Sequence, residues 1–512
     1  MNINILDYFE ATVKKHPQKI AIMDHCQAYS YSQVMEMSKK MAMLLMNKKK
    51  SPILVLCNRD VRCLILFWGV IYSGNFYVPI DEKVPLKRLK HMVDHTNAKI
   101  IVSIKGCKEI DEYCCTRDIK SIHFSQIYEG IKIDEKKLLC VYENMLDIDP
   151  LYMVYTSGST GKPKGVLKTQ KSVLNFLYSF QKVFSLREQD VFANQVSFDF
   201  DVAAKDIFLS MYVGATLVII PKQCFMVPKE LIIFLNKHKV TILIWSVAAI
   251  RYVASSGILA KEKPEFLRKV FFSGEVLQMH ELKEWIMYLE NIDYINLYAP
   301  TEVTGNCMYY IVDQMHGLKR LPLGLVFPNM EVMVLKEDYQ KVKENEIGEI
   351  YIRGAFLSQG YYQDLERTKK SFVQNPLHHD YLDVVYKTGD LARQVEGQLY
   401  FIGRVDHQIK HMGYRIELEE IEQALYTQTS QVNRCCAIYD VEKNKIILIL
   451  QGEFIKNKKI RSILSNVLPK YMIPHQYIWL DKLPENIRGK LDRKKTMEQY
   501  LKMKNSGELY AE

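Results

Sequence analysis

The stretch YTSGSTGKPKG, residues 155–165, is dense in glycine, hydroxyl side chains and lysine. It directly follows the apolar run 151–154, which has the character of a buried strand. Glycines allow backbone N–H groups to turn towards an anion, and hydroxyl and ammonium groups add further donors. A strand followed by such a loop predicts a phosphate-binding site.

Two familiar phosphate-loop motifs and a plain linker fit this loop less well. A Walker A loop requires Gly-Lys followed by Ser or Thr, whereas Pro163 follows Gly161 and Lys162 here. The protein-kinase motifs HRD and DFG do not occur in the sequence. A surface linker is also disfavoured, because apolar residues resume immediately at Val166 and Leu167.

The composition is that of a multidomain globular protein. The 512 residues exceed one ordinary core, and 48% hydrophobic and 25% charged residues lie near the average. Residues 1–24 do not resemble a secretory signal, and the apolar runs are shorter than the roughly 18 residues that a membrane span requires. We therefore expect a cytoplasmic, monomeric protein without a membrane span.

The positive charge is concentrated towards the C-terminus. Residues 407–512 hold 18 Lys and Arg against 13 Asp and Glu, a difference of +5 out of the net +10 of the chain. No nucleic-acid motif accompanies these residues, so the sharper expectation is an acidic protein partner. An ordinary solvated surface is the alternative.

The pattern of elements changes along the chain. Short apolar strands, such as 20–23, 52–57, 99–104, 216–220 and 241–245, alternate with helical stretches such as 5–16 and 62–72, which predicts α/β layers with mostly parallel sheets. From residue 331 the sequence pattern is that of β-hairpins, and after residue 404 it is that of a compact α+β region. We predict a domain of residues 1–405 and a second of residues 406–512.

Further segments follow the loop in a recognisable order. They are SGNFYVPID (73–81), FDFDV (198–202), FFSGEVL (271–277), NLYAPTEVT (296–304), GEIYIRGAFLSQGYY (348–362), YKTGDLA (386–392), GRVDHQIKHMGYRIELEEIE (403–422), LPKYMIP (468–474) and RGKLDRKK (488–495). Together with the loop they resemble the adenylate-forming superfamily of acyl-CoA synthetases, luciferases and adenylation domains of nonribosomal peptide synthetases. The similarity is greatest to stand-alone amino-acid adenylation domains and D-alanine–carrier-protein ligases.

The resemblance implies a fold and an ATP site. The fold would be a large N-terminal domain of layered parallel sheets and helices with a distorted β-barrel subdomain, plus a small mobile α+β C-terminal domain. Thr301 would contact the α-phosphate of ATP, and Glu302 would bind Mg²⁺. Tyr298 and Gly274 would lie against adenine, and Asp390 and Arg404 would lie at the ribose. The other implied ATP-binding residues belong to the glycine-rich loop and are Thr156, Ser157, Gly158, Ser159, Thr160, Gly161 and Lys164.

Two further residues are implied in the C-terminal part. Lys490 matches the catalytic lysine that neutralises charge in the transition state, although Arg488 stands where the family usually has Asn. Asp406 matches the hinge about which the C-terminal domain turns between adenylation and thiol transfer. Ala299 replaces the glycine of the usual YGPTE.

The resemblance also implies a pocket for the amino acid, which is located by the FDFD segment. Asp199 matches the aspartate that pairs with the α-ammonium group, and Asp201 is expected to be the N-cap of the following helix. The other pocket positions are Phe200, Ala203, Ile244, Phe271, Ser273, Leu297, Gly305 and Asn306. Ala203 and Gly305 would open space that the two phenylalanines narrow, which favours a small or medium uncharged amino acid.

The sequence therefore predicts ATP-dependent formation of an aminoacyl adenylate, with ATP and Mg²⁺ and with release of pyrophosphate. The aminoacyl group would pass to the phosphopantetheine thiol of a separate carrier protein. An acyl- or aryl-CoA ligase, a D-alanine–carrier-protein ligase of wall-polymer alanylation and a catalytically idle binding protein are the alternatives. Ala203 and Ser273 stand where D-alanine ligases typically have Met and Cys, which argues against D-alanine itself.

Overall fold

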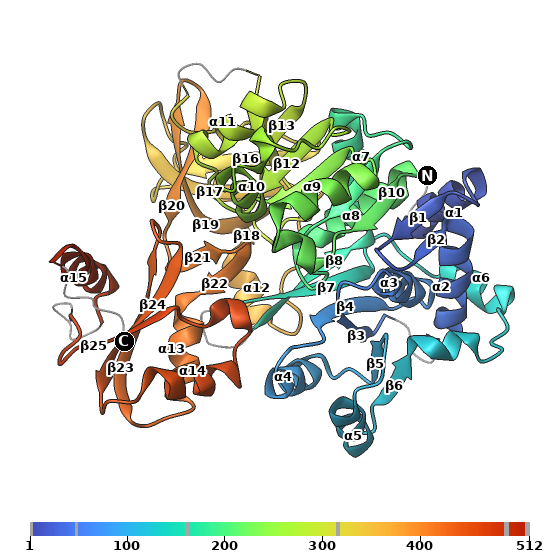
Figure 1. Ribbon diagram of the computed structural model, residues 1–512, viewed down its shortest axis with the longest axis horizontal. Coiled ribbons are helices and arrows are strands. Elements are labelled where there is room, and N and C mark those ends of the chain that lie inside the picture. The colour runs from blue at the N-terminus through green and yellow to red at the C-terminus, as the bar shows by residue number, and fades with distance from the viewer. Residues whose placement is uncertain (1–3, 47–49, 159–162, 314–317, 486–490, 507–512) are drawn as a thin grey trace. The chain divides into compact units, whose positions relative to one another are not determined.

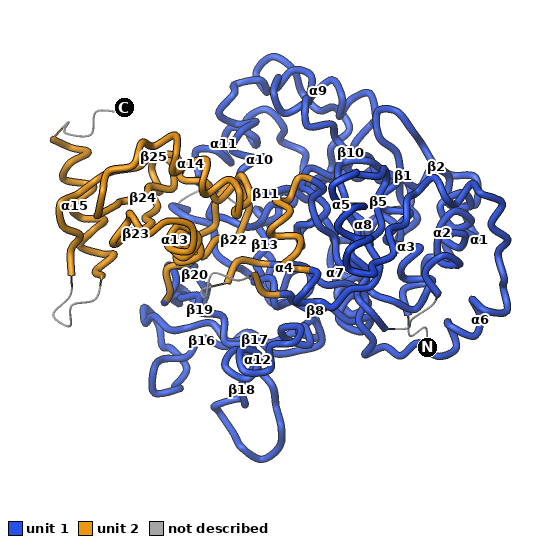
Figure 2. Tube along the Cα trace, turned by 90° about the horizontal axis from the view of Figure 1, so that it is seen from below, with its two compact units in different colours: residues 1–82, 93–155, 165–405 blue, residues 83–92, 156–164, 406–512 orange. Residues whose placement is uncertain are grey.

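The computed structural model describes residues 4–46, 50–158, 163–313, 318–485 and 491–506. The chain divides into two compact units, shown in Figure 2. The first comprises residues 1–82, 93–155 and 165–405, and the second comprises residues 83–92, 156–164 and 406–512. The main division thus falls between Val405 and Asp406. Two short segments of the N-terminal part, one of them containing most of the glycine-rich loop, group with the C-terminal residues.

Two largely parallel sheets build most of the first unit (Figure 1). The first sheet contains, in spatial order, β15 (Leu325–Val326), β14 (Met308–Ile311), β13 (Asp293–Tyr298), β12 (Lys269–Ser273), β11 (Ile242–Ser246), β9 (Val191–Asn194), β10 (Thr216–Ile219), β1 (Ile20–Met23) and β2 (Ala28–Ser30). The second contains β6 (Lys120–His123), β5 (Ile100–Ser103), β3 (Pro52–Cys57), β4 (Phe76–Asp81), β7 (Pro150–Thr156) and β8 (Lys164–Thr169). The predicted strands 52–57 and 20–23 are confirmed to the residue. The predicted strand 216–220 ends one residue earlier, and the strands predicted at 99–104 and 241–245 differ by one residue at each end.

Helices cover both sheets because the strands are apolar on both faces. Strand β3, for example, is buried at every position. The helices of this unit are α1 (Ile5–Lys15), α2 (Tyr31–Leu45), α3 (Arg62–Tyr72), α5 (Lys108–Thr116), α6 (Glu135–Glu143), α7 (Gln170–Phe184), α8 (Asp201–Val213), α9 (Pro228–Lys237), α10 (Val247–Ser255), α11 (Met279–Tyr288) and α12 (Leu365–Ser371), and α4 (Leu86–Thr96) runs across the division between units.

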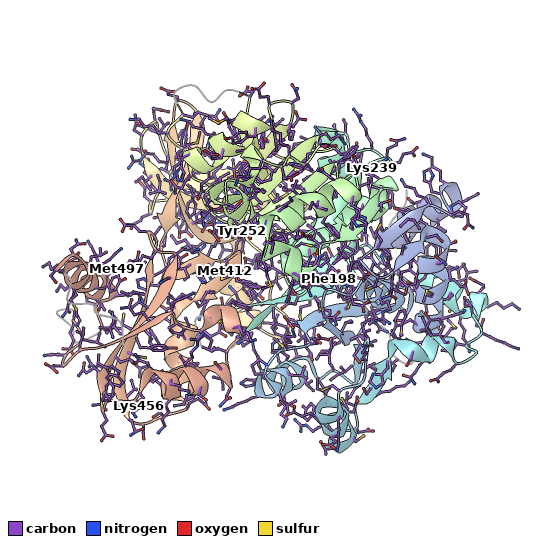
Figure 3. The ribbon with its side chains drawn as sticks, viewed as in Figure 1. Phe198, Lys239, Tyr252, Met412, Lys456 and Met497 are labelled. Carbon is purple, nitrogen blue, oxygen red and sulfur yellow. The ribbon has the colours of Figure 1, made fainter. Side chains whose placement is uncertain are left out.

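One hydrophobic core joins these layers. Phe9 of α1 stacks on Trp68 of α3 with ring centroids 4.2 Å apart, and Trp68 meets Phe208 of α8 edge-on at 6.0 Å. Phe198, labelled in Figure 3, lies buried just before α8 and contacts Phe67 edge-on at 6.0 Å. The start of α8 is therefore fixed in the core.

The hairpin-like region forms a third sheet in the first unit. Its strands are β16 (Met330–Leu335), β17 (Ile347–Gly354), β19 (Val384–Val395), β18 (Phe372–Gln374) and β20 (Gln398–Arg404), all paired antiparallel. The subdomain expected as a distorted barrel is seen as this five-stranded sheet, in which β20 branches from β19. The pairing places Asp390 directly opposite Arg404.

The C-terminal part of the second unit is α+β, as the sequence predicts. It contains the hairpin β21 (Gln408–His411) and β22 (Tyr414–Glu417), and a three-stranded sheet of β23 (Val432–Asp440), β24 (Lys445–Gly452) and β25 (Gln476–Trp479). Its helices are α13 (Leu418–Tyr426), α14 (Asn457–Ser465) and α15 (Arg493–Ser506). Across the described parts of both units, no helix combines the length and apolar character needed to cross a membrane.

Candidate active site

The candidate site of the first unit lies where parallel strands end. Strands β11, β12 and β13 run parallel, and Ser273 at the end of β12 is in register with Ser246 and Leu297. Thr301 and Glu302 follow β13 after three residues. The carboxyl ends of parallel strands are the usual place for ligand sites in α/β folds.

The buried Asp390 carboxylate of the third sheet accepts hydrogen bonds from two side chains. The Tyr298 hydroxyl donates to Asp390 Oδ2 at 2.6 Å, and the Arg404 guanidinium donates to Asp390 Oδ1 and, at 3.1 Å, to the Thr388 carbonyl. Burial, followed by the charge of Asp390, raises the pKa of Tyr298 well above its usual value. The structure thus brings together three of the predicted ATP-binding residues. Gly274 has φ +104° and open space around it.

Glu302 and Thr301 are held by side chains that the sequence analysis did not select. Glu302 is fully buried, and its Oε1 accepts a hydrogen bond of 2.7 Å from the Tyr361 hydroxyl. Lys168 of β8 is also fully buried and donates to the Thr301 carbonyl. Burial lowers the pKa of Lys168, while the charges of Asp201 and Glu302 oppose that shift. This lysine therefore sets the backbone from which Thr301 and Glu302 project.

The structure separates the two aspartates of FDFD. Asp199 is buried, its Oδ1 makes no hydrogen bond within the described residues, and burial raises its pKa to about 6. The charged groups that act on it are Asp81 and Lys222. Thr301 and Glu302 are not among the groups that shift the pKa of Asp199.

Asp201, the second aspartate of FDFD, lies beside the groups that hold Thr301. Its Oδ2 lies 3.7 Å from Lys168 Nζ, and its Oδ1 accepts from the Tyr152 hydroxyl at 3.2 Å. Through Lys168 it is linked to the Thr301 carbonyl. The prediction that Asp201 caps the helix is wrong: Asp201 is the first residue of α8, and Phe200 is the N-cap without a side-chain cap bond. The backbone changes from extended at Phe200 to helical at Asp201, so the two aspartates have different surroundings.

The helical register also changes the rest of the predicted pocket. Residues 201 and 205 lie one turn apart on one face of α8, whereas Ala203 points elsewhere and is packed in the core. Lys205 Nζ lies 3.0 Å from Asn306 Oδ1 and 3.3 Å from Ser273 Oγ. Lys205, which the sequence did not single out, thus contacts two of the predicted pocket residues.

The remaining pocket positions are largely apolar and buried. Ile244, Phe271 and Leu297 are between 0 and 3% exposed, and the Phe271 ring also packs against two phenylalanines of α7. Gly305 has φ +68°, and a Cβ there would lie 2.3 Å from the Phe176 ring. Only Ser273 and Asn306 among these positions offer polar groups to Lys205.

The glycine-rich loop belongs mainly to the second unit. The Ser157 hydroxyl donates to the Arg415 carbonyl at 2.8 Å and accepts from the Glu417 amide at 3.0 Å. The Gly158 amide donates to Glu420 Oε2 at 3.1 Å. The buried Thr156 Oγ1 makes no hydrogen bond within the described residues.

Lys164 and Asp406 are the other predicted residues of this unit that the structure describes. Lys164 begins β8, and its charge lowers the pKa of Glu417 against the larger raising effect of burial. Asp406 accepts a hydrogen bond of 3.2 Å from the Gln408 amide. Ser159, Thr160, Gly161 and Lys490 lie outside the described residues.

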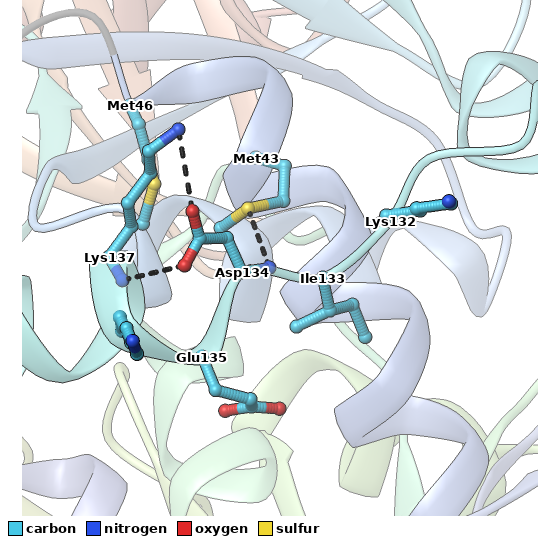
Figure 4. A pocket seen from close by; sticks show the side chains of 8 residues that line it. Met43, Met46, Lys132, Ile133, Asp134, Glu135 and Lys137 are labelled. Carbon is cyan, nitrogen blue, oxygen red and sulfur yellow. Dashed lines mark hydrogen bonds and ion pairs between the residues drawn. The ribbon is translucent and has the colours of Figure 1, made fainter.

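A surface hollow elsewhere in the first unit is unrelated to these residues. It has a volume of about 840 Å³ and is lined by residues 132–137 with Met43 and Met46 (Figure 4). Its polar contacts are local, such as the Asp134 amide to Met43 Sδ at 3.4 Å. None of the predicted site residues lines it.

Comparison with known proteins places this arrangement in a family. Residues 9–362 match the model of the family described as AMP-binding enzyme. The chain belongs to the AMP-binding enzyme family. The glycine-rich loop and the motifs that follow it had predicted this family.

Relatives within the AMP-binding family cover nearly the whole chain. Gramicidin S synthase 1 of Brevibacillus brevis is 28% identical over 502 residues, which are 96% of this chain and 44% of that protein. The chain thus spans less than half of the length of that relative. A D-alanine–D-alanyl carrier protein ligase of Bacillus velezensis is 28% identical over 522 residues, 98% of this chain and 100% of its own length.

The fold is shared with solved adenylation domains. The Vibrio cholerae adenylation domain AlmE, in complex with glycyl-adenosine-5'-phosphate, matches with a TM-score of 0.83 at 21% identity, over 98% of each chain. The predicted fold class, with mixed α/β layers and parallel sheets, is confirmed.

Proposed function

We propose that the chain activates an amino acid as its aminoacyl adenylate, with release of pyrophosphate, and transfers it to the phosphopantetheine thiol of a separate carrier protein. The observation that carries the amino-acid part is Asp201, a buried carboxylate linked through Lys168 to the Thr301 carbonyl. A substrate ammonium group would add a second cation to the long Lys168 contact of that carboxylate, whereas a plain acyl chain would bring no cation to it. We further propose that the protein acts as a cytoplasmic monomer.

In this proposal, several of the polar groups described above have a task in adenylation. The Asp390 carboxylate, oriented by Tyr298 and Arg404, would accept hydrogen bonds from the ribose hydroxyls of ATP. Thr301 would contact the α-phosphate as the substrate carboxylate attacks it. The loop residues, from Thr156 to Gly161 together with Lys164, would bind the β- and γ-phosphates that leave as pyrophosphate.

Glu302 has the properties of a ligand for Mg²⁺. It offers hard carboxylate oxygens, its orientation is fixed by Tyr361, and one or two carboxylates together with substrate phosphates are the usual protein contribution to a magnesium site. Bound there, the ion would neutralise phosphate charge as pyrophosphate leaves. Tyr361 and Lys168 keep the Glu302 carboxylate and its backbone in place before the ion binds.

The transfer step would use the second unit. Lys490 would stabilise the charge that develops during adenylation, and rotation about Asp406 would then replace it with the surroundings of the thiol. The carrier protein is supported by the name of the D-alanyl carrier protein ligase, which matches along its full length. That relative makes D-alanyl transfer to a carrier of wall-polymer alanylation the second candidate.

Amino-acid-dependent exchange between ATP and labelled pyrophosphate tests the proposal. We expect exchange with at least one amino acid and none with fatty or aryl acids. Lys490→Ala should abolish exchange while sparing thiol transfer from a supplied adenylate, and the exposed Lys494→Ala is the matched control in the same basic segment. Exchange with fatty or aryl acids alone would favour the CoA-ligase alternative, and no exchange with any acid would favour a binding protein.

A further inference from the structure

One buried cation has no task in the adenylation chemistry proposed above. Lys205 of α8 is 3% exposed, and its ammonium group contacts Asn306 Oδ1 at 3.0 Å and Ser273 Oγ at 3.3 Å. Burial lowers the pKa of Lys205 to about 8, so the group is still mostly charged at neutral pH. An ammonium enclosed with neutral oxygens alone is costly unless a stronger acceptor joins it.

The carboxylates near Lys205 are engaged with other groups. Within the described residues no carboxylate oxygen lies within 4.0 Å of Lys205 Nζ, the limit for an ion pair. Asp206 Oδ2 accepts instead from the Asn194 amide at 3.0 Å, and burial raises the pKa of Asp206 to about 7. Asp201 lies beside Lys168 at 3.7 Å. An acceptor for Lys205 would therefore come from a bound molecule.

The groups around Lys205 are suited to a carboxylate. Asn306 uses its amide oxygen on Lys205, and its amide nitrogen makes no hydrogen bond to the rest of the described chain. Ser273 adds a hydroxyl at the end of β12, where the substrate pocket was predicted. The cluster thus presents an ammonium, an amide N–H₂ and a hydroxyl, which together complement an anionic acceptor.

The charge along α8 points to the same kind of ligand. Asp201 and Lys205 lie one turn apart on one face, so a negative and a positive group stand side by side. Asp201 would take the α-ammonium of a substrate, and Lys168 partly balances Asp201. Burial outweighs the charges of Asp206 and Asp201 in lowering the pKa of Lys205, so a side-chain carboxylate in direct contact would compensate the ammonium where a neutral side chain would not.

We propose that Lys205 binds the side-chain carboxylate of an acidic amino-acid substrate, with Ser273 and Asn306 completing the subsite. This inference rests on the proposed adenylation function. It replaces the small or medium uncharged side chain expected from the sequence, because that expectation did not take Lys205 into account.

The first experiment measures pyrophosphate exchange by the full chain with aspartate, glutamate, asparagine, glutamine, alanine and leucine. We expect kcat/KM for the better of the two acids to exceed that of its own amide by about 10- to 100-fold, the range of a charge-assisted hydrogen bond. Equal or faster exchange with an uncharged amino acid would overturn the inference and leave the adenylation function intact. No exchange with any amino acid would refute the proposed function, and the inference would fall with it.

The second experiment compares variants. Lys205→Met should reduce the preference for the acid over its amide towards one, whereas Lys237→Met, at an exposed lysine of α9, should leave it unchanged. An unchanged preference in a folded Lys205→Met protein would overturn the inference. If thermal unfolding shows that Lys205→Met does not fold, Asn306→Ala and Ser273→Ala replace it. Each should then lower the preference several-fold, and an undiminished preference in both would count as refutation.

Discussion

Replacing each of the two FDFD aspartates by asparagine is the sharpest test of their separate roles. In Asp201→Asn the side chain keeps its size but loses the charge that we assign to the substrate ammonium. A hydrogen bond to a charged group contributes about 1.5–3 kcal/mol, which corresponds to roughly a 10- to 150-fold loss in kcat/KM for amino-acid-dependent pyrophosphate exchange. Asp199→Asn should retain exchange within about twofold of the unsubstituted protein, because Asp199 lies apart from Lys168 and Thr301.

Asp199→Asn should also change how the free energy of unfolding depends on pH. Burial raises the folded-state pKa of Asp199 from 3.8 to about 6, so between these values the folded protein binds more protons than the unfolded chain. Stability therefore falls as the pH rises through this window, by about 3 kcal/mol in total at 1.36 kcal/mol per pKa unit. The asparagine variant cannot ionise and should lack this loss, so its stability relative to the unsubstituted protein should improve from pH 4 to pH 7.5 in urea unfolding.

The control for both variants is Asp380→Asn, at an exposed aspartate of the third sheet region. It should change neither exchange nor the pH dependence of unfolding. The reasoning would be refuted if Asp199→Asn lost exchange by tenfold or more while Asp201→Asn retained it. Such a result would return the ammonium site to the first aspartate.

Three further substitutions test the supports of the site. Lys168→Met removes the fully buried member of the pair with Asp201 and should cost about 3–5 kcal/mol. Adding Asp201→Asn should recover part of that loss, so strictly additive effects on the thermal midpoint would contradict the pairing. Gly305→Ala should lower the free energy of unfolding in urea by about 2–4 kcal/mol, because residue 305 has a positive φ and an added Cβ would clash with the Phe176 ring. An unchanged urea midpoint would show that the ring moves aside at little cost. Glu420→Gln weakens a buried bond of 2.8 Å to Arg88, so hydrogen exchange should rise in residues 83–92 and 418–426, and unaltered protection would argue against this ion pair.

The layered fold could be predicted because it depends on patterns that are local in the sequence. Uninterrupted apolar runs such as Pro52–Cys57 can only be strands covered on both faces, and the structure has them at those bounds. The helix at 62–72 is likewise confirmed to the residue. The order of the motifs was sufficient to recognise the family.

The interior of the site could not be predicted, because it depends on which face of one helix is turned inward. FDFD contains two aspartates at alternate positions, and only the start of α8 at Asp201 decides between them. Lys168 and Lys205 were missed because lysine is rarely buried. The signal that was available is the Lys-Asp pair inside the otherwise apolar segment 202–213, since charges within an apolar helix require partners.

The discontinuous second unit has a consequence for how the protein can be divided. A fragment ending at Val405 would retain residues 83–92 and 156–158 but lose Glu420, Arg415 and Glu417, to which they are bonded. Arg88 would then lose the Glu420 carboxylate, and the first residues of the glycine-rich loop would lose the hydrogen bonds that they make to this part of the chain. The change in sequence pattern near residue 405 is therefore a poor place to truncate the protein, because residues beyond it hold the start of the glycine-rich loop.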